Sequence, residues 1–357
     1  MNIMSPLNRI EEVEALIEDG ATCFYAGVMP PGWRDRYSNM ASPNRREWKS
    51  SNFLDYDDFG RAIRLADDRG VPVFMALNAL YTEAQYEMID EIVAHAEDAG
   101  VKALIVADLG MFLHLAEGGT KLELHVSTGA TIFNRRAAEL FIRLGASRVT
   151  LPRHNTVDEL CSLTRDLAPV PTDVFVLNSG CKNIDGFCTF HHGENEVQVG
   201  RLWDMFKNAG ADHYLLEAMR KLPEWMTRTA SDLSLFGSIS ACFLPYKVTN
   251  VSPREMTDEL RHRTEQNVRK SFNFFSAMDH CAACAIPAFK RAGVDALKIV
   301  GRNHPTSKKR KDVRFLRALL DLTERFDDDP PREEILELHR AHYGGDCEGL
   351  CYYPEAE

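Results

Sequence analysis

Five cysteines stand where thiolate ligands of a metal centre are expected. Cys181 and Cys188 follow the apolar run TDVFVLN within the polar, glycine-containing stretch NSGCKNIDGFC, where burial in a core explains them poorly. Cys242, Cys281 and Cys284 come much later in the chain. Four thiolates that converge suit either a structural zinc ion or an iron–sulfur cluster. Zinc sites usually combine two close CxxC pairs, whereas one CxxC pair and three dispersed cysteines favour a cluster.

The remaining cysteines point to other roles. Cys23 lies in the apolar run TCFYAG and Cys161 in the amphipathic run VDELCSLTRDL, so both are predicted to be core residues. Cys347 and Cys351, in GGDCEGLCYYP, either bind a second metal or occupy a glycine-rich turn without one. An alternative for the CxxC pair is a redox dithiol, although such pairs usually open the first helix of a different fold.

The composition indicates a protein that does not depend on disulfides. Its 357 residues are 45% hydrophobic, which suffices for one large α/β domain or two ordinary ones. Nine cysteines, an odd count, suit a reducing compartment better than a disulfide framework. No stretch approaches the roughly 20 apolar residues of a membrane span, and no secretion signal opens the chain, so we expect a cytoplasmic protein.

The charge balance bears on the partners. A formal net charge of -11 at pH 7 makes the molecule as a whole repel polyanions. The basic run SKKRKD, with Lys308 to Lys311, is the one candidate contact for nucleic acid, and such runs are more often solvated faces. A small ring-containing substrate is therefore expected before a large RNA, because phosphate neutralisation supplies most of the affinity for RNA.

A repeated phrase indicates the elements that position these residues. Each copy combines an amphipathic stretch, a glycine and a short apolar run. Glycine suits a helix C-terminus because it adopts the left-handed conformation without steric cost, and the apolar run suits a strand buried on both faces. The copies are EDGATCFYAG, DRGVPVFMALN, DAGVKALIVAD, RLGASRVTLPR, NAGADHYLLEA and RAGVDALKIVG. Their alternation predicts a parallel α/β protein.

Eight candidate strands predict a TIM-like (β/α)8 barrel over residues 1–326. The NAGADHYLLEA copy is assigned to a long, cysteine-bearing insertion region at 179–290, before the last strand, and 327–357 form a short C-terminal extension. A doubly wound open sheet is the alternative, but neither GxGxxG nor GxxxxGKS/T occurs. The predicted strands are 2–7, 22–27, 71–78, 103–107, 122–127, 148–152, 172–178 and 295–300.

Side chains at the C-terminal ends of barrel strands usually carry the chemistry. Those at the predicted strand ends are Asn78, Asp108, His125, Ser127, Thr128, Arg153, Asn178, Cys181 and Arg302. Among them, His125, Asp108, Arg153 and Arg302 are predicted to be the polar partners of a substrate. Arg302 either binds an anionic substrate through two N–H groups or forms a salt bridge across the barrel rim.

The chain resembles peptidase family U32, the collagenase-like peptidases, over nearly all of residues 1–326. The phrases that carry the resemblance are EDGATCFYAG, SSNF, RGVPVFMALNALYTE, GVKALIVADLG, LHVST, GASRVTLPR and AGVDALKIVGR. The resemblance implies an oxygen-independent hydroxylase, like the family members that act on ubiquinone precursors or on bases in tRNA and ribosomal RNA. It also implies a [4Fe-4S] cluster as the cofactor.

The resemblance further implies which cysteines hold that cluster. The first ligand pair of the family has six residues between its thiols, as Cys181 and Cys188 have. The last ligand of the family stands six residues before a proline, which selects Cys281 over Cys284. Cys242 is then the candidate third ligand, because it lies between the other two groups.

Two departures from the family pattern indicate a divergent subfamily. Gly129 stands where the family often has Gln, and Val300 stands where it often has Glu. The substrate is therefore expected to be a ring-containing metabolite or an RNA base, without a closer assignment. One alternative is a metal-containing accessory subunit, since the quinone-linked members resemble heterodimers with a second U32-type subunit. A peptidase is disfavoured because the chain has neither GxSxG nor HExxH.

Overall fold

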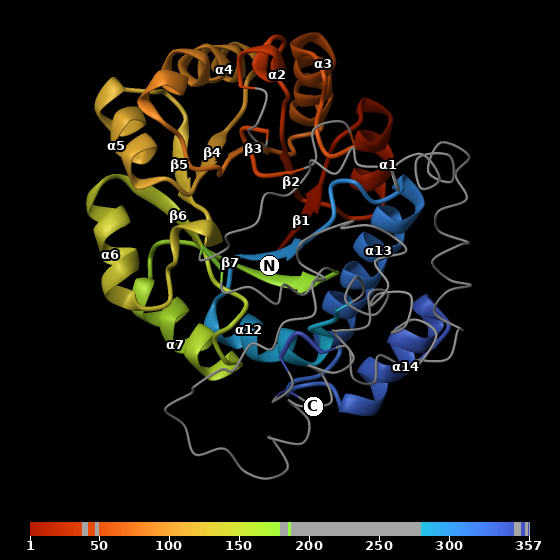
Figure 1. Cartoon of the computed structure of the whole chain (residues 1–357). Helices are drawn as coiled ribbons and strands as arrows, with labels where there is room; N and C mark the ends of the chain where they lie inside the picture. The colour runs from red at the N-terminus through yellow and green to blue at the C-terminus, as the bar shows by residue number, and fades with distance from the viewer. Residues whose placement is uncertain are drawn as a thin grey trace, which may run out of the picture.

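The computed structural model describes residues 1–37, 42–46, 50–178, 185–186, 280–345, 351–353 and 356. Its strands form one closed barrel, in which each strand pairs in parallel with the next and the last returns to the first (Figure 1). The strands are β1 (Asn2–Pro6), β2 (Cys23–Ala26), β3 (Val73–Leu77), β4 (Ala103–Val106), β5 (Glu123–Val126), β6 (Ala146–Thr150), β7 (Thr172–Leu177) and β8 (Ala296–Ile299).

The predicted TIM-like barrel is thereby confirmed, and the predicted strand ends differ from the observed ones by at most two residues. The largest shift is at β6, which was expected over 148–152. This strand begins earlier because its pairing with β5 starts at Ala146, opposite Leu124. It ends before Pro152, which has no N–H group to continue the ladder.

Helices surround the barrel; those from α1 to α12 lie between successive strands, and α13 and α14 follow β8 (Figure 1). They are α1 (Val13–Glu18), α2 (Trp33–Arg36), α3 (Tyr56–Asp67), α4 (Tyr86–Ala99), α5 (Leu109–Gly118), α6 (Arg135–Arg143), α7 (Val157–Leu167), α12 (Ile286–Ala292), α13 (Thr306–Thr323) and α14 (Arg332–Tyr343), with 3-10 turns η1 (Ile10–Glu12), η2 (Glu83–Gln85), η3 (Thr128–Ala130) and η6 (Ala283–Ala285). As the repeated phrase predicts, α4 and α12 end at Gly100 and Gly293, whose φ angles of +89° and +84° are left-handed.

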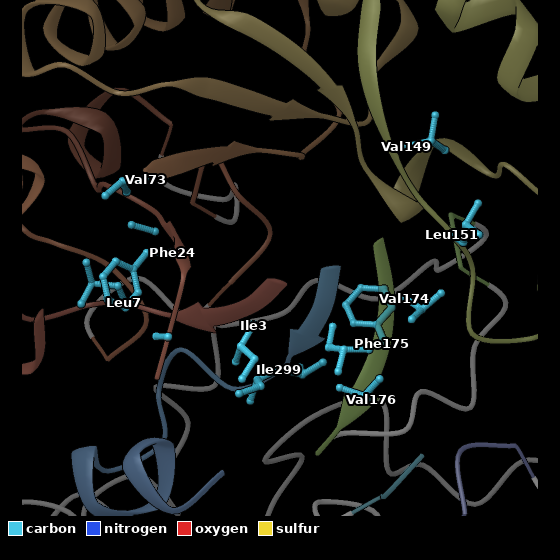
Figure 2. Packing of buried hydrophobic residues seen from close by; sticks show 14 of the residues in the cluster. Ile3, Leu7, Phe24, Val73, Val149, Leu151, Val174, Phe175, Val176 and Ile299 are labelled. Carbon is cyan, nitrogen blue, oxygen red and sulfur yellow. The ribbon is translucent and has the colours of Figure 1, made fainter. Parts of the chain in front are cut away.

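Alternation along the strands divides the apolar residues between two regions. Phe24, Leu104 and Val126 belong to the large cluster between strands and helices, part of which Figure 2 shows. Their sequence neighbours Tyr25 and Ile105 belong to a second, smaller cluster. Because successive side chains of a strand point to opposite faces, this second cluster fills the barrel interior, as in other small barrels.

Ionised side chains lie inside the N-terminal end of the barrel. Nη1 of Arg148 on β6 is 2.6 Å from a carboxylate oxygen of Asp173 on β7 and 2.6 Å from one of Asp295, which precedes β8. The hydroxyl of Thr150 donates to the other oxygen of Asp173 at 3.2 Å. This network therefore links three consecutive strand segments at the end of the barrel opposite the usual active site.

Residues 280–282 pair with the C-terminal end of β7, and residues 351–353 pair with residues 280–282 on the other side. Ala282 N–H donates to Val176 O at 2.8 Å, and Tyr352 N–H donates to Cys281 O at 2.9 Å. These contacts bring the chain end against the barrel. Most of the predicted insertion region, including the NAGADHYLLEA copy, lies outside the described residues, and the domain boundaries stay predictions. In the described ranges, no helix is long and apolar enough to cross a membrane.

Candidate active site at the barrel mouth

Arg302 lies buried at the C-terminal mouth of the barrel, with 4% of its surface exposed. One end of its guanidinium, Nη2, donates to Oδ1 of Asn44 at 2.8 Å, whereas Nη1 has no hydrogen-bond partner among the described residues. Burial lowers the pKa of Arg302 to about 9, so the group remains charged at neutral pH. A buried cation with an unused N–H group is costly unless something negative binds there.

Gly27, just past β2, makes room for this guanidinium. A Cβ atom at residue 27 would overlap Nη1 of Arg302 and would stand 2.5 Å from the amide groups of both Asn44 and Asn52. The two amides hold each other, because Nδ2 of Asn44 donates to Oδ1 of Asn52 at 2.6 Å. Gly27 and the two asparagines, all from the segment after β2, therefore fix the position of the Arg302 guanidinium, which comes from the end of β8.

Further cations surround Tyr25, which lies inside the barrel. Nζ of Lys298 on β8 is 4.9 Å from the centre of the Tyr25 ring, within cation–π range, and Cζ of Arg302 is 5.9 Å from it. Burial raises the pKa of the Tyr25 phenol, while Arg302, Arg46 and Arg153 act to lower it. Burial also lowers the pKa of Lys298 to about 8. The mouth is thus locally cationic in an acidic protein.

Arg153, just past β6, is held by a buried acid. Its backbone N–H and its Nε donate to one carboxylate oxygen of Asp185 at 2.8 and 3.1 Å, and its guanidinium lies 4.8 Å from the centre of the Phe175 ring. Burial would raise the pKa of Asp185, but Arg153 outweighs it and the pKa is lowered. Arg153 therefore forms a buried salt bridge at the barrel rim, whereas no described acid forms one with Arg302.

His125 lies inside the barrel, with 2% of its surface exposed, and faces the start of its own strand. Its Nε2 is 3.4 Å from a carboxylate oxygen of Glu123, and its ring meets that of Phe74 edge to face at 4.7 Å. Burial lowers the pKa of His125 to about 4, so the imidazole is neutral at pH 7. Its Nδ1 has no partner among the described residues.

Asp108 caps a helix. One carboxylate oxygen accepts the Met111 N–H at 2.8 Å, which caps α5, and the other accepts the Tyr81 N–H at 3.1 Å. A carboxylate at a helix N-cap satisfies backbone donors that would otherwise be unpaired. Its contacts therefore indicate a structural role.

The ends of β3 and β5, which flank β4, present polar atoms without partners in the described part of the chain. They are Oδ1 of Asn78, after β3, and Oγ1 of Thr128, after β5. Nδ2 of Asn78 lies 3.4 Å from the hydroxyl of Ser127. Buried polar atoms are normally satisfied, so a ligand with donor groups suits this side of the mouth.

The cysteines fall into three groups. Cys23 and Cys161 are buried core residues, as predicted. Cys181, Cys188, Cys242 and Cys347 lie outside the described residues, so the predicted cluster ligands there and the alternatives for the pair Cys347 and Cys351 are untested. Cys281, Cys284 and Cys351 line one small cavity beside the end of β7. The described ranges contain no three metal-binding side chains already gathered around one point.

Two lysines of the basic run SKKRKD, Lys308 and Lys309, contact residues of the same chain. Nζ of Lys309 is buried and lies 2.8 Å from a carboxylate oxygen of Glu12. Lys308 contacts Asp312 at 2.6 Å and donates to Oδ1 of Asn178 at 2.8 Å. The structure therefore gives these two lysines partners within the barrel, and neither forms the solvated face that the sequence favoured.

Asn44, Asn52 and Lys298 are site residues that sequence reasoning missed. The only available signal was for Lys298, a single cation inside the apolar run ALKIV. The two asparagines come from the segment after β2, where no strand end or motif marks them.

Comparison with known proteins defines the class of this barrel. The profile of peptidase family U32 matches residues 8–199 and 238–350, so the chain belongs to that family. A solved U32 peptidase structure shares 18% identity with a TM-score of 0.39, covering 50% of this chain and 69% of that one.

Curated relatives carry different names. The tRNA hydroxylation protein P2 of Bacillus subtilis (strain 168) is 27% identical over 170 residues, which cover 48% of this chain and 50% of that protein. The 23S rRNA 5-hydroxycytidine C2501 synthase of Escherichia coli (strain K12) is 23% identical, with coverages of 56% and 28%. A collagenase of Porphyromonas gingivalis (strain ATCC BAA-308 / W83) is 22% identical, with coverages of 56% and 47%. The chain thus spans half or less of these relatives.

Proposed function

We propose that this U32 protein is an enzyme that hydroxylates, or modifies in a related oxygen-independent way, a ring-containing substrate that carries a negative charge. Family membership and the two relatives named for RNA hydroxylation support the reaction class. The observation that carries the substrate class is the buried guanidinium of Arg302, whose Nη1 has no partner in the described part of the chain.

The residues of the mouth divide the work of binding. Arg302 donates to an anionic group of the substrate, and the neighbouring Lys298 adds a second positive charge at the same end of the barrel. Asn78, after β3, and Thr128, after β5, accept hydrogen bonds from donor groups of the substrate. Arg153, neutralised by Asp185, supports the site by holding the Phe175 ring rather than by binding an anion.

The proposed cofactor is a [4Fe-4S] cluster, with Cys181, Cys188, Cys242 and Cys281 as candidate ligands. Of these, the structure describes Cys281, and its environment fits a thiolate ligand. The side chain lines a cavity together with two further cysteines, and its Sγ accepts the Ala283 N–H at 3.4 Å. When bound, the cluster would supply electron transfer to the mouth.

The positive charges are confined to the barrel mouth of an otherwise acidic molecule. Such a site is better suited to bind a small anionic metabolite or one nucleotide of an RNA than to bind a long stretch of RNA backbone. A ring-containing metabolite and an RNA base both meet this requirement, and the experiment below separates them. A second U32-type subunit is proposed as a partner that could complete the substrate site.

The test expresses the full chain in a host whose own U32 genes are deleted, and measures new products 16 Da heavier than their precursors in RNA nucleosides and in small metabolites. We expect such a product in one of the two pools with the wild type. Arg302→Gln should lower the yield on the order of 10- to 100-fold, as expected when one charge-assisted hydrogen bond is lost. Iron and sulfide should stay unchanged.

Arg136→Gln is the matched control, because Arg136 is an exposed arginine on α6 and should leave the yield unchanged. A cluster-loaded wild type that gives no heavier product, alone or with a second U32-type subunit, would refute the hydroxylase proposal. An Arg302→Gln variant with full yield would refute the anion site alone.

A further inference from the structure

Three cysteines from distant parts of the sequence share one cavity beside the end of β7. Cys281 and Cys284 precede α12, and Cys351 belongs to the chain end. The rest of the cavity wall is alanine and tyrosine side chains and backbone, from Ala282, Ala283, Ala285, Tyr353 and Ala356. The thiols are therefore the groups in this cavity with the strongest affinity for a soft or borderline metal.

Backbone pairing fixes how the two segments meet. Residue 281 forms an antiparallel bridge with Leu177 on one side and a parallel bridge with residue 351 on the other. Directly paired residues of adjacent strands project their side chains to the same side. The pairing therefore sets the side chains of Cys281 and Cys351 next to each other.

Tyr352 and Tyr353 hold residues 351–353 against the end of β7. The hydroxyl of Tyr353 donates to Phe175 O at 3.2 Å, and the hydroxyl of Tyr352 donates to Asn178 O. Both tyrosines are buried. Cys351 is thus held against the barrel by its own neighbours, independently of any metal.

Cys281 and Cys284 form a CxxC pair at a short turn that precedes α12. The N–H of Ala283 donates to Sγ of Cys281 at 3.4 Å, so the turn holds this sulfur in place. The 3-10 turn η6 then carries Cys284 to the same cavity. A CxxC turn with an N–H directed at its first sulfur offers two thiolates to one metal.

We propose that Cys284 and Cys351 join Cys281 as ligands of one thiolate-bound metal centre, so that the C-terminal segment completes the centre. This inference rests on the metal centre of the proposed function and changes its ligand set: because a [4Fe-4S] cluster takes four thiolates, Cys284 and Cys351 would replace two of the candidates Cys181, Cys188 and Cys242. The three side chains are not gathered around one point among the described residues, so metal binding would reorient the thiol side chains while the backbone pairing of residues 281 and 351 is kept.

The test uses the full-length protein, purified anaerobically and reconstituted in parallel with Fe²⁺ plus sulfide or with Zn²⁺. Metal per chain is measured for the wild type, for Cys351→Ser and Cys284→Ser, and for the control Cys161→Ser, whose thiol lies on α7. We expect the first two variants to lose at least half of the metal and the control to retain it.

Alkylation by iodoacetamide provides a readout that needs no variant. In the wild type, Cys351 should react at least 10-fold more slowly in metal-loaded protein than in metal-free protein. Equal alkylation rates, or full metal content in folded Cys351→Ser, would overturn the inference and leave the hydroxylase proposal standing. Zinc binding with no iron binding would support the thiolate centre but refute the proposed cluster. A wild type that binds neither metal would refute both.

Discussion

At the scale of single residues, the buried imidazole of His125 couples the stability of the barrel to pH. Its pKa is about 4 in the folded protein and 6.5 ordinarily, so the unfolded chain binds the proton more readily between these values. The contribution of neutral His125 to the free energy of unfolding is therefore complete above pH 6.5 and is lost as the pH falls towards 4. The wild type should lose about 2 kcal/mol between pH 7 and pH 5 through this residue.

His125→Phe keeps an aromatic ring beside Phe74 and removes the titration. We therefore expect its free energy of unfolding, measured by urea denaturation, to fall less steeply between pH 7 and pH 5 than that of the wild type. Equal slopes for the two proteins would show that His125 does not carry this dependence.

Single residues also show what the sequence could and could not predict about the site. Arg153 and Arg302 look alike in the sequence, since each follows an apolar run. They differ because Asp185 neutralises Arg153, and that acid comes from a distant position that no local pattern marks. Position at a strand end was predictable, whereas the partner that decides the role of each arginine was not.

At the scale of elements, Asp108 caps α5 from a position just after β4, where barrel enzymes also carry active-site residues. Removal of its carboxylate in Asp108→Ala should destabilise the protein by about 1 kcal/mol, because α5 loses its cap and Tyr81 N–H loses its acceptor. Asp108→Asn should cost less, since asparagine also caps helices. Thermal unfolding checks both expectations, and lost activity in a fully stable Asp108→Asn would contradict a purely structural role.

The elements of the barrel were predictable because each strand is a short apolar run next to a glycine or a polar strand end. The added segments 280–282 and 351–353 were not. Their pairing depends on contacts between distant parts of the chain. Long-range pairing of this kind leaves no local signal.

At the scale of the whole molecule, charged side chains at the N-terminal end of the barrel link strands that close it. Arg148 lies between Asp173 and Asp295 and thereby ties β6 to β7 and to the start of β8. Arg148→Met should destabilise the protein by about 3 kcal/mol or more, because it leaves a buried carboxylate unpaired. The exposed Arg136→Met should change stability by less than about 0.5 kcal/mol. Urea denaturation compares the two, and similar losses would argue against the network.

Gly27 constrains which substitutions the mouth can accept together. The space that a side chain would need is already filled by Arg302 and by two asparagine amides. A larger residue at position 27 is therefore compatible only with a smaller one at position 302. Across related chains the two positions should covary, and a chain that has replaced this glycine should also lack the buried cation and, with it, the proposed preference for anionic substrates.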